Sequence, residues 1–358
     1  QDLNLRKKFT GTPEKVVNLF TFIAQEVREI LAELGFKNLN EIIGRTDLLR
    51  QVSRGTSNLD DLDLSPLLVQ ADPGNNDRYC ATNLINEVPP TLDEKIYKDI
   101  KNSIGKNKVE SSYEIKNVHR AVGTRLSHYI FKKFGNKGIE ENIVEINLSG
   151  SAGQSLGAFG IKGLKLNVTG DANDYVGKGL SGATIVIKPP ADSNLVSNDN
   201  TIIGNTVLYG ATSGKLFAAG QSGERFAVRN SGAEAVVEGC DSNGCEYMTG
   251  GNVVILGSVG NNFAAGMTGG MAFVYDKEGT LPVRINLDTV IYQQQMTPYW
   301  ENYLFLKIEE HYQVTQSNHA KNLIENWEKE KLLFWQVIPE EMINKFENPV
   351  LVEEIKIA

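Results

Sequence analysis

The sequence predicts a mainly β protein: a right-handed parallel β-helix built on glycine-cornered coils of about 19 residues, with α-helices flanking it at both ends. Between residues 150 and 276, seven glycines each precede a short run of alternating or continuous apolar residues: Gly163, Gly182, Gly204, Gly223, Gly232, Gly251 and Gly270. Four of the intervals have the same length: 163 to 182, 204 to 223, 232 to 251 and 251 to 270. The step from 182 to 204 is slightly longer and carries the insertion PPADSNLVSNDN, and the step from 223 to 232 is a half-step.

The apolar runs are short, and glycine corners separate them at about half of the coil length. This pattern does not fit amphipathic helices, whose apolar residues recur about every 3.6 residues. Glycine is required at the corners because the chain turns sharply there at positive φ or lies against the next coil. We therefore interpret the seven glycines as structural corners, each followed by a strand. A left-handed β-helix of hexapeptides is the alternative, but the irregular steps break its register.

A helix is predicted from Pro13 to Leu34. Thr12 is a suitable N-cap, Pro13 suits the first turn, and Gly35 ends the helix. Its apolar stripe is too broad for a free surface helix, so we expect a missing packing partner and an N-terminus cut from a longer polypeptide. Asn38 and Glu41 resemble a capping box for a short helix through Ile43.

Four segments organise the chain. Residues 1–50 form a helical end, 51–140 a crossing segment, 141–290 the β-helix and 291–358 a helical cap. The crossing segment is predicted to contain helices at 92–104 and 118–134 and a strand at 109–115. A strand at 143–148 leads into the repeat. After the repeat we predict a last strand at 283–290, helices at 299–315 and 320–331, and an apolar anchor at residues 333–337.

Composition excludes several classes of function. The 358 residues are 41% hydrophobic and 22% charged, with a net charge of −8, which disfavours a nucleic acid partner. No apolar run approaches the length of about 18 residues that indicates a membrane-spanning helix, so no span is expected. The start of the chain carries no signal-peptide pattern, and an intracellular location is the default expectation.

The residues that carry chemistry are sparse. Cys240 and Cys245 lie in CDSNGC, a spacing compatible with a metal site or a disulfide, but no second pair completes four ligands. We interpret them, with Cys80, as reduced thiols, and all four histidines as structural or surface residues: His119, His128, His311 and His319.

Three further patterns suggest ligands. The run GSAGQSLGAFG (150–160) resembles a phosphate cradle, but a strand rather than a helix is predicted after it. Asp171 and Asp174 suggest a calcium turn, yet no acidic repeat recurs. The lysines and arginines of the coils are scattered, as on a solvated or interface face. We therefore predict no catalytic, cofactor-binding or metal-ligating residue in this chain.

Three separated segments resemble one enzyme family. The run GSAGQSLGAFGIKGLKLNVTGDANDYVGKGLSGATIVIKPP is similar to the C-terminal GXGXG domain of the glutamate synthase large subunit. Residues 5–49 resemble the end of that enzyme's flavin-binding domain, and LLFWQVIP resembles its closing segment. The resemblance covers nearly the whole chain in the right order.

The resemblance implies a reaction that converts glutamine and 2-oxoglutarate into two glutamates. An amidotransferase domain releases ammonia, and a barrel carrying FMN and a [3Fe-4S] cluster reduces the resulting imine. Electrons come from ferredoxin or from a pyridine-nucleotide-oxidising subunit. The family's cluster cysteines precede the segment that matches Gln1, and Cys80, Cys240 and Cys245 match none of them. No catalytic residue carries over, so this chain alone is expected to bind neither cofactor.

Two interpretations follow. The first is a structural part of glutamate synthase that holds the amidotransferase and FMN domains together, located in the cytoplasm or, in a photosynthetic eukaryote, in the plastid stroma. The second is a free-standing β-helix scaffold or assembly subunit of another oxidoreductase complex, since a related β-helix occurs in a subunit of formylmethanofuran dehydrogenase. A helix at 13–34 favours the first, because an independent subunit has no reason to begin with the last helices of a flavin barrel. A sugar-cleaving β-helix enzyme is a distant third, since no acids cluster on one coil face.

Overall fold

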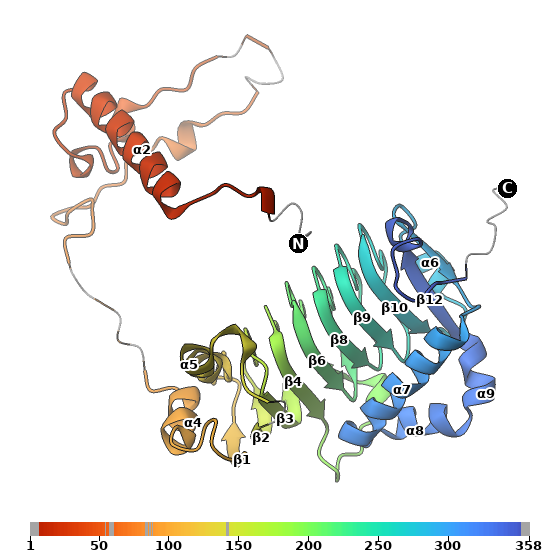
Figure 1. Cartoon of the computed structure of the whole chain (residues 1–358). Helices are drawn as coiled ribbons and strands as arrows, with labels where there is room; N and C mark the ends of the chain where they lie inside the picture. Colours follow the sequence, from red (N-terminus) through yellow and green to blue (C-terminus); the bar gives the residue numbers. More distant parts are fainter. Residues whose placement is uncertain are drawn as a thin grey trace. The chain divides into compact units, whose positions relative to one another are not determined.

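The computed structural model describes residues 7–351, except residues 54, 57–60, 83, 84, 86, 88, 141 and 142. The chain divides into two compact units, residues 1–88 and residues 89–358. The first unit contains one long helix and short turns, and the second unit contains the sheet (Figure 1). Among the described residues, no helix combines the length and apolar character needed to cross a bilayer.

The first unit is organised by α2 (Pro13–Glu33). As predicted, Thr12 caps it by accepting a hydrogen bond from the Lys15 backbone N–H at 3.4 Å, and Gly35 follows its end at a φ of +79°. The predicted second helix is wrong. Only one 3₁₀ turn forms, η1 (Leu39–Glu41), because the Asn38 amide donates to the Glu41 carboxylate at 2.6 Å instead of capping a helix. The other turns in this unit are η2 (Thr46–Leu48) and η3 (Ser65–Leu67).

The second unit is built on a sheet of twelve strands. Their bounds are β1 (Val109–Ile115), β2 (Val144–Ala152), β3 (Leu164–Ala172), β4 (Ser181–Lys188), β5 (Thr201–Ile203), β6 (Ser213–Ala218), β7 (Gln221–Ser222), β8 (Ser231–Val237), β9 (Thr249–Ile255), β10 (Gly269–Tyr275), β11 (Val290–Gln293) and β12 (Phe334–Pro339). The main path runs β1-β2-β3-β4-β6-β8-β9-β10-β12-β11, and the short strands β5 and β7 pair off it. The expectation of a mainly β protein with flanking helices is confirmed.

All pairs from β1 to β10 are parallel, and their register reveals the repeat. Lys165 lies opposite Thr184, and Lys215 lies opposite Glu234, so the partners in both pairs are one glycine period apart in the sequence. Thr184, however, lies opposite Lys215, which is a longer step, because the insertion after β4 adds a loop containing η5 (Ser197–Asp199).

The strands predicted after Gly204 and Gly223 are therefore wrong. Both segments form turns, and the strand that follows β4 on the main path begins beside Gly214. The equally spaced glycines therefore belong to two sets: one set lies near the starts of strands, and the other lies at the starts of turns.

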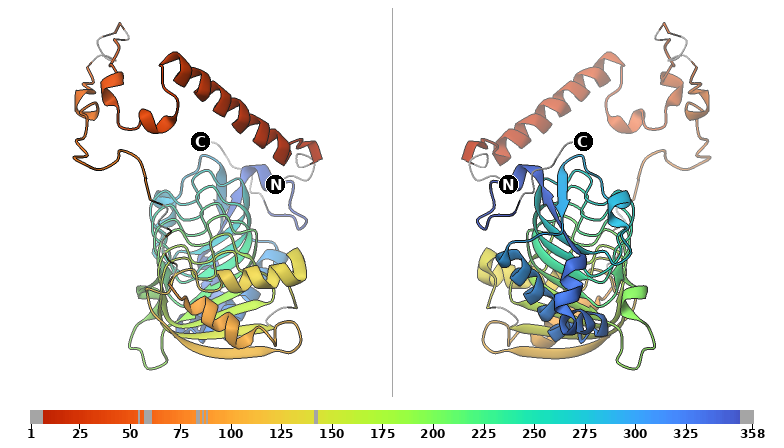
Figure 2. Two further views of the ribbon diagram at one scale, coloured as in Figure 1. Left: turned by 90° about the vertical axis from the view of Figure 1, so that its left-hand side faces the viewer. Right: turned by 90° about the vertical axis from the view of Figure 1, so that its right-hand side faces the viewer.

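Each central strand is buried on both faces. Ile185 and Ile187 of β4 pack into the main hydrophobic core on one face of the sheet, whereas Val186 packs into a second cluster on the opposite face. That second face is covered by α7 (Pro298–Thr315) and α8 (Asn318–Glu325), which pack Trp300, Leu304, Ile308 and Leu323 against Phe217 and Phe273 of the sheet. Figure 2 shows these helices lying across the strands. The predicted helix at 320–331 is interrupted: α8 ends at Glu325, and α9 (Trp327–Glu330) is followed by η6 (Lys331–Leu333).

The first end of the sheet is closed by α4 (Leu92–Ile100) and α5 (Thr124–Phe134), both shown in Figure 2. The helix predicted from residue 118 begins only at Thr124, because Ala121 and Gly123 adopt positive φ. Asp93 fixes the start of α5 by accepting hydrogen bonds from the backbone N–H groups of Gly123 (2.9 Å) and Arg125 (2.7 Å). A 3₁₀ turn, η4 (Gly135–Lys137), follows α5.

The last end of the sheet differs from the prediction. In place of a strand at 283–290, a short helix α6 (Leu281–Arg284) is followed by β11, which begins at Val290. The predicted apolar anchor is in fact β12, which pairs antiparallel with β10 and β11. Strand β12 thereby covers the edge of β10 that would otherwise be open. A final 3₁₀ turn, η7, spans Glu340–Met342.

Candidate functional site

Between successive strands of the second unit lie turns in which every second residue has positive φ. We call these the left-handed turns. Their positive-φ residues are Ser155, Gly157 and Phe159; Tyr175, Gly177 and Gly179; Thr206, Leu208 and Gly210; Arg225, Ala227 and Arg229; Asn243, Cys245 and Tyr247; and Asn262, Ala264 and Gly266. Most of them are not glycine, so the sequence alone did not reveal the pattern.

Backbone hydrogen bonds between successive turns hold this conformation. The N–H of Ser155 donates to the next turn, at Asp174 O (2.8 Å), whereas the N–H of the central Gly177 donates back to Leu156 O (2.9 Å). The alternation repeats along the stack, as in Arg225 N to Ser242 O (2.9 Å) and Cys245 N to Phe226 O (2.7 Å). A non-glycine residue at positive φ costs about 1–2 kcal/mol, and pairing on both sides offsets that cost.

The seven predicted glycines lie where neighbouring segments of the second unit approach closely. Gly163, Gly182, Gly251 and Gly270 have positive φ, the first just before its strand and the others at the second or third residue of theirs. At Gly232 a Cβ atom would lie 2.3 Å from Thr212 O of the neighbouring strand region. At Gly204 and Gly223 it would lie 2.3 Å from the Oδ1 atoms of Asp174 and Asn205, respectively.

The cysteines have no reactive setting. Cys240 and Cys245 are buried free thiols, and Cys80 is an exposed one. Burial, with Asp241 nearby, raises the pKa of Cys240 to about 12, and burial raises the pKa of Cys245 as well. Thiols that stay protonated are poor nucleophiles and poor ligands. Cys245 occupies the central, inward position of its turn, where the neighbouring turns carry Ala227 and Ala264.

The acidic pair Asp171 and Asp174, whose spacing suggested a calcium turn that was then disfavoured, is used within the fold. Asp174 accepts a hydrogen bond from the backbone N–H of Asn205 at 2.8 Å, and Asp171 accepts one from the Ser151 hydroxyl at 2.9 Å. Across the described ranges, no group of three or more His, Cys, Asp or Glu side chains is arranged to hold a metal ion.

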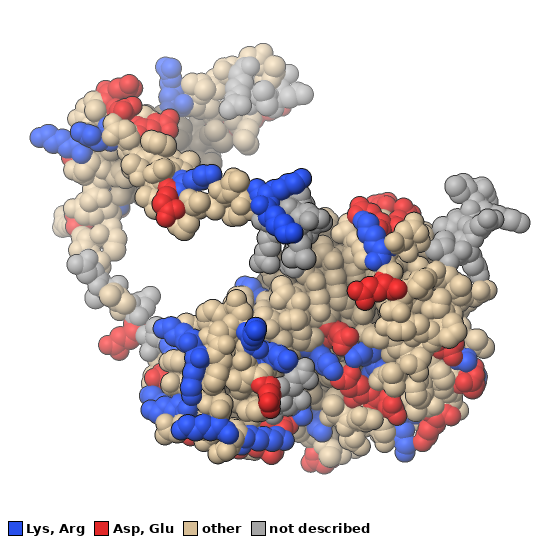
Figure 3. All heavy atoms as spheres, in the orientation of Figure 1, with Lys and Arg blue, Asp and Glu red and all other residues tan. Residues whose placement is uncertain are grey.

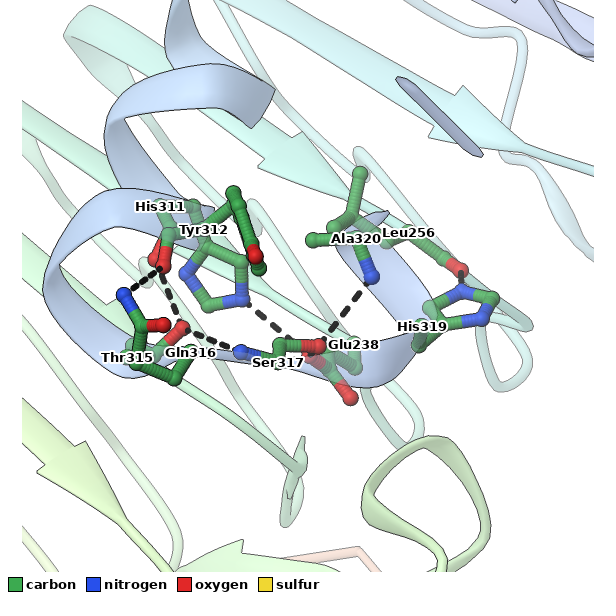
Figure 4. Close-up of polar contacts among 9 residues, drawn as sticks. All are labelled: Glu238, Leu256, His311, Tyr312, Thr315, Gln316, Ser317, His319 and Ala320. Carbon is green, nitrogen blue, oxygen red and sulfur yellow. Dashed lines mark hydrogen bonds and ion pairs between the residues drawn. The ribbon is translucent and has the colours of Figure 1, made fainter. Parts of the chain in front are cut away.

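A buried polar cluster that the sequence did not predict joins the sheet to its covering helices (Figure 4). Glu238 directly follows β8 and is fully buried, as is His311 of α7. Atom Oε1 of Glu238 lies 3.1 Å from His311 Nε2 and also accepts a hydrogen bond from the Ser317 hydroxyl. The Ser317 oxygen in turn caps α8 by accepting the backbone N–H of Ala320 at 3.1 Å. We call Glu238, His311 and Ser317 the polar hub.

The polar hub has the residue types of a hydrolase triad but not its order. In a triad the histidine lies between serine and acid, so that it removes the serine proton. Here the carboxylate lies between the two, and all three side chains are buried. Burial raises the pKa of Glu238, but hydrogen bonding and charge from His311, with Ser197 and Ser317, outweigh burial and hold the pKa below its ordinary value. The hub is therefore a hydrogen-bonded anchor between the sheet and its covering helices rather than a nucleophile.

One signal in the sequence indicated that His311 is buried, although not which residues it contacts. His311 falls on the same helical stripe as Leu304 and Ile308, so helical periodicity places it on the buried face of α7. The other histidine in this region, His319, lies beside Leu256 O, with Nε2 at 2.6 Å. His119 accepts a hydrogen bond from the Lys116 backbone at 3.1 Å, and His128 lies on α5 near Tyr129.

Two surface grooves lie on the sheet unit. One of about 550 Å³ lies where the insertion after β4 faces the ends of β2 and β3, lined by Ser149, Asp171, Pro190, Leu195 and Ile202. The other, of about 620 Å³, is lined by Lys137, Lys162, Gly182, Gly214 and Glu234. The residues that line these two grooves include neither a histidine nor a cysteine. On the face in Figure 3, basic side chains gather over α4 and α5, where Lys98 and Lys108 are mostly exposed.

Comparison with known proteins decides the family. A family model described as "GXGXG motif" matches residues 93–340, which contain the left-handed turns and the polar hub. The chain belongs to the GXGXG motif family.

Relatives of this GXGXG chain include glutamate synthase large chains. It is 61% identical over 351 residues to "Glutamate synthase [NADPH] large chain" of Azospirillum brasilense, covering 98% of this chain and 23% of that protein. It is 46% identical over 343 residues to "Ferredoxin-dependent glutamate synthase 2" of Synechocystis sp., covering 95% and 22%. The Bacillus subtilis NADPH large chain is 43% identical over 348 residues, covering 95% and 22%. The chain thus spans less than a quarter of the length of these relatives.

Proposed function

We propose that this chain is the C-terminal structural part of a glutamate synthase large chain. The whole enzyme would convert glutamine, 2-oxoglutarate and reductant into two glutamates, using FMN and a [3Fe-4S] cluster held outside these residues. Within it, this part would form a right-handed parallel β-helix that holds the amidotransferase and FMN domains, without chemistry of its own. Ferredoxin or a pyridine-nucleotide-oxidising subunit would supply electrons, in the cytoplasm or the plastid stroma.

The observation that carries the proposal is the exposed apolar surface of α2. Only Leu31 of this helix is buried. Most of its other large apolar side chains lie exposed: Val16, Val17, Leu19, Phe20, Phe22, Ile23 and Ile30. A contiguous apolar patch of this kind marks a surface that another protein part covers. The proposed boundaries are residues 1–50 for the end of the FMN domain, 51–140 for the crossing segment, 141–290 for the β-helix and 291–358 for the helical cap.

Two measurements test this function. The first is the denatured mass of the polypeptide that carries this sequence in its source. A species far heavier than the 39.4 kDa of this chain supports a part of a large synthase, and a species at 39.4 kDa supports the free-standing scaffold instead. The second is the flavin and iron content of the purified chain. We expect neither cofactor, and stoichiometric flavin would contradict the proposal.

A further inference from the structure

The left-handed turns present aromatic and basic side chains to solvent. Five consecutive turns contribute aromatic or basic residues to this surface, and the fourth turn carries both Arg229 and Arg225, of which Arg225 pairs with Glu246 at 3.1 Å. One exposed residue from each turn lines this face: Phe159, Tyr175, Tyr209, Arg229 and Tyr247. We call these five residues the ladder face. The central positive-φ residue of each turn points inward and is buried, which leaves the outer positions to face outward. The four rings are 57%, 38%, 38% and 48% exposed, respectively.

Several of these side chains are fixed in place before any partner binds. The Phe159 ring covers Gly179, where a Cβ atom would lie 2.6 Å from the ring, and the Tyr247 ring covers Gly266 at the same distance. The Arg229 guanidinium lies 5.3 Å from the Tyr247 ring centroid, and the Lys178 amine lies 5.7 Å from that of Tyr175. Binding to such preorganised side chains loses little conformational entropy.

The ladder face contrasts with the covered face of the sheet. Helices α7 and α8 bury Phe217 and Phe273 on that other face. Single exposed apolar residues are normal on a protein surface, but aromatic residues and arginine gathered together are the composition of interface hot spots. Within the part of the chain that the structure describes, Arg229 and Lys178 make no ion pair, so a partner that offers carboxylates fits best.

We propose that the ladder face binds a carboxylate-bearing surface of the same large polypeptide, contributed by the part that lies outside these 358 residues. This inference rests on the proposed function. The relatives match this chain over only 22–23% of their length, so more than three quarters of such a polypeptide is available as the partner. A nucleic acid partner is disfavoured by the net charge of −8.

The test uses the complete large chain with a photo-crosslinking residue, in the variants Tyr247→p-benzoylphenylalanine and Phe159→p-benzoylphenylalanine. The matched control is Tyr299→p-benzoylphenylalanine, since Tyr299 on α7 is also 48% exposed. After irradiation, peptide mass spectrometry should find both ladder positions linked to peptides outside this sequence, in the same polypeptide, at a yield at least fivefold above the control. Adding Arg229→Glu should lower the Tyr247 yield at least fivefold.

Each other result overturns the inference. Links only between two copies would assign the face to self-association, and yields equal to the control would show that the face is not a preferred contact. If Arg229→Glu leaves the crosslinking yield at position 247 unchanged, a carboxylate partner for Arg229 is excluded. Failure of the proposed function is distinguishable, because the denatured mass would then be 39.4 kDa and no longer polypeptide would exist to crosslink.

Discussion

The two units of this chain place their apolar residues in opposite ways. In the sheet unit, strands such as β4 and β6 bury side chains on both faces, one face against the main hydrophobic core and the other against the helices α7 and α8. In the first unit, α2 is well capped and regular but leaves Phe20 and Phe22 about two-thirds exposed. Local sequence signals therefore favour both the helix α2 and the strands of the sheet. Burial of side chains against other elements stabilises the sheet, and not α2.

The largest expected change in the free energy of unfolding comes from a substitution on the covered face of the sheet. Phe217→Ala removes a buried ring that packs between the sheet and α7, and it should lower the free energy of unfolding by about 3–5 kcal/mol. Urea unfolding followed by tryptophan fluorescence measures this, because Trp300 lies in the same cluster. Phe22→Ala on α2 is the matched control and should change the value by less than about 0.5 kcal/mol. Equal losses in the two variants would refute the contrast.

The next effect tests the polar hub. Glu238→Gln keeps the shape but removes the charge that His311 and Ser317 contact, which should cost about 2 kcal/mol near neutral pH. The folded pKa of Glu238 is lowered, so its contribution is present above the unfolded value of 4.5 and is lost as pH falls through the folded pKa. Melting temperatures measured between about pH 3 and pH 7 should therefore converge for wild type and variant at acid pH.

A constant difference between the two melting curves at all pH values would contradict an ionised Glu238 in the folded state. Lys307→Met is a second comparison from the same interface, since Lys307 pairs with Glu234 at 2.8 Å and Glu310 at 2.9 Å. This substitution removes a cation and leaves the polar hub intact. With Lys307→Met in the background, the melting temperatures of proteins with and without Glu238→Gln should therefore still converge at acid pH.

A smaller effect sharpens the difference between strands and left-handed turns. Ala264 has a φ of +62°, so Ala264→Gly should be neutral or stabilising by up to about 1 kcal/mol. Ala235→Gly in β8, where the backbone is an ordinary strand, should instead destabilise by about 1 kcal/mol. Thermal unfolding of the two variants compares them directly. The same sign of change at both positions would argue against the left-handed conformation.

The smallest effect on stability concerns α2. Phe20→Glu changes an exposed residue, so the unfolding free energy of the sheet unit should move by less than about 0.5 kcal/mol. Self-association should fall, because a charge interrupts the exposed apolar surface. Sedimentation velocity of wild type and variant at several concentrations measures this. Equal sedimentation would mean that α2 is not the surface that associates.

Much of the fold was predictable because it depends on local signals. The helix at Pro13, the strand Val109–Ile115 and the strand that begins near Leu164 followed from caps and apolar alternation. The predicted strands after Gly204 and Gly223 failed because their apolar residues serve turns in which alternate residues have positive φ. Most of those residues are not glycine, and the inter-turn hydrogen bonds that stabilise them cannot be seen in one sequence.

The polar hub was unpredictable for a related reason. Glu238 and His311 are 73 residues apart, and only the packing of α7 on the sheet brings them together. Strand β12 likewise carries a short apolar run, and only its antiparallel pairing with β10 identifies it as a strand. Both the polar hub and strand β12 depend on contacts between segments that are distant in the sequence.

Native-state hydrogen exchange of the purified chain tests the contrast between the two units most directly. The account predicts that amides of β4, β6, β8 and β9 are protected to nearly the global unfolding free energy, whereas amides of α2 exchange within a few tenfold of the free-peptide rate. Protection of α2 equal to that of the central strands would contradict the account, because it would show that the helix is stable without a partner from the rest of a larger polypeptide.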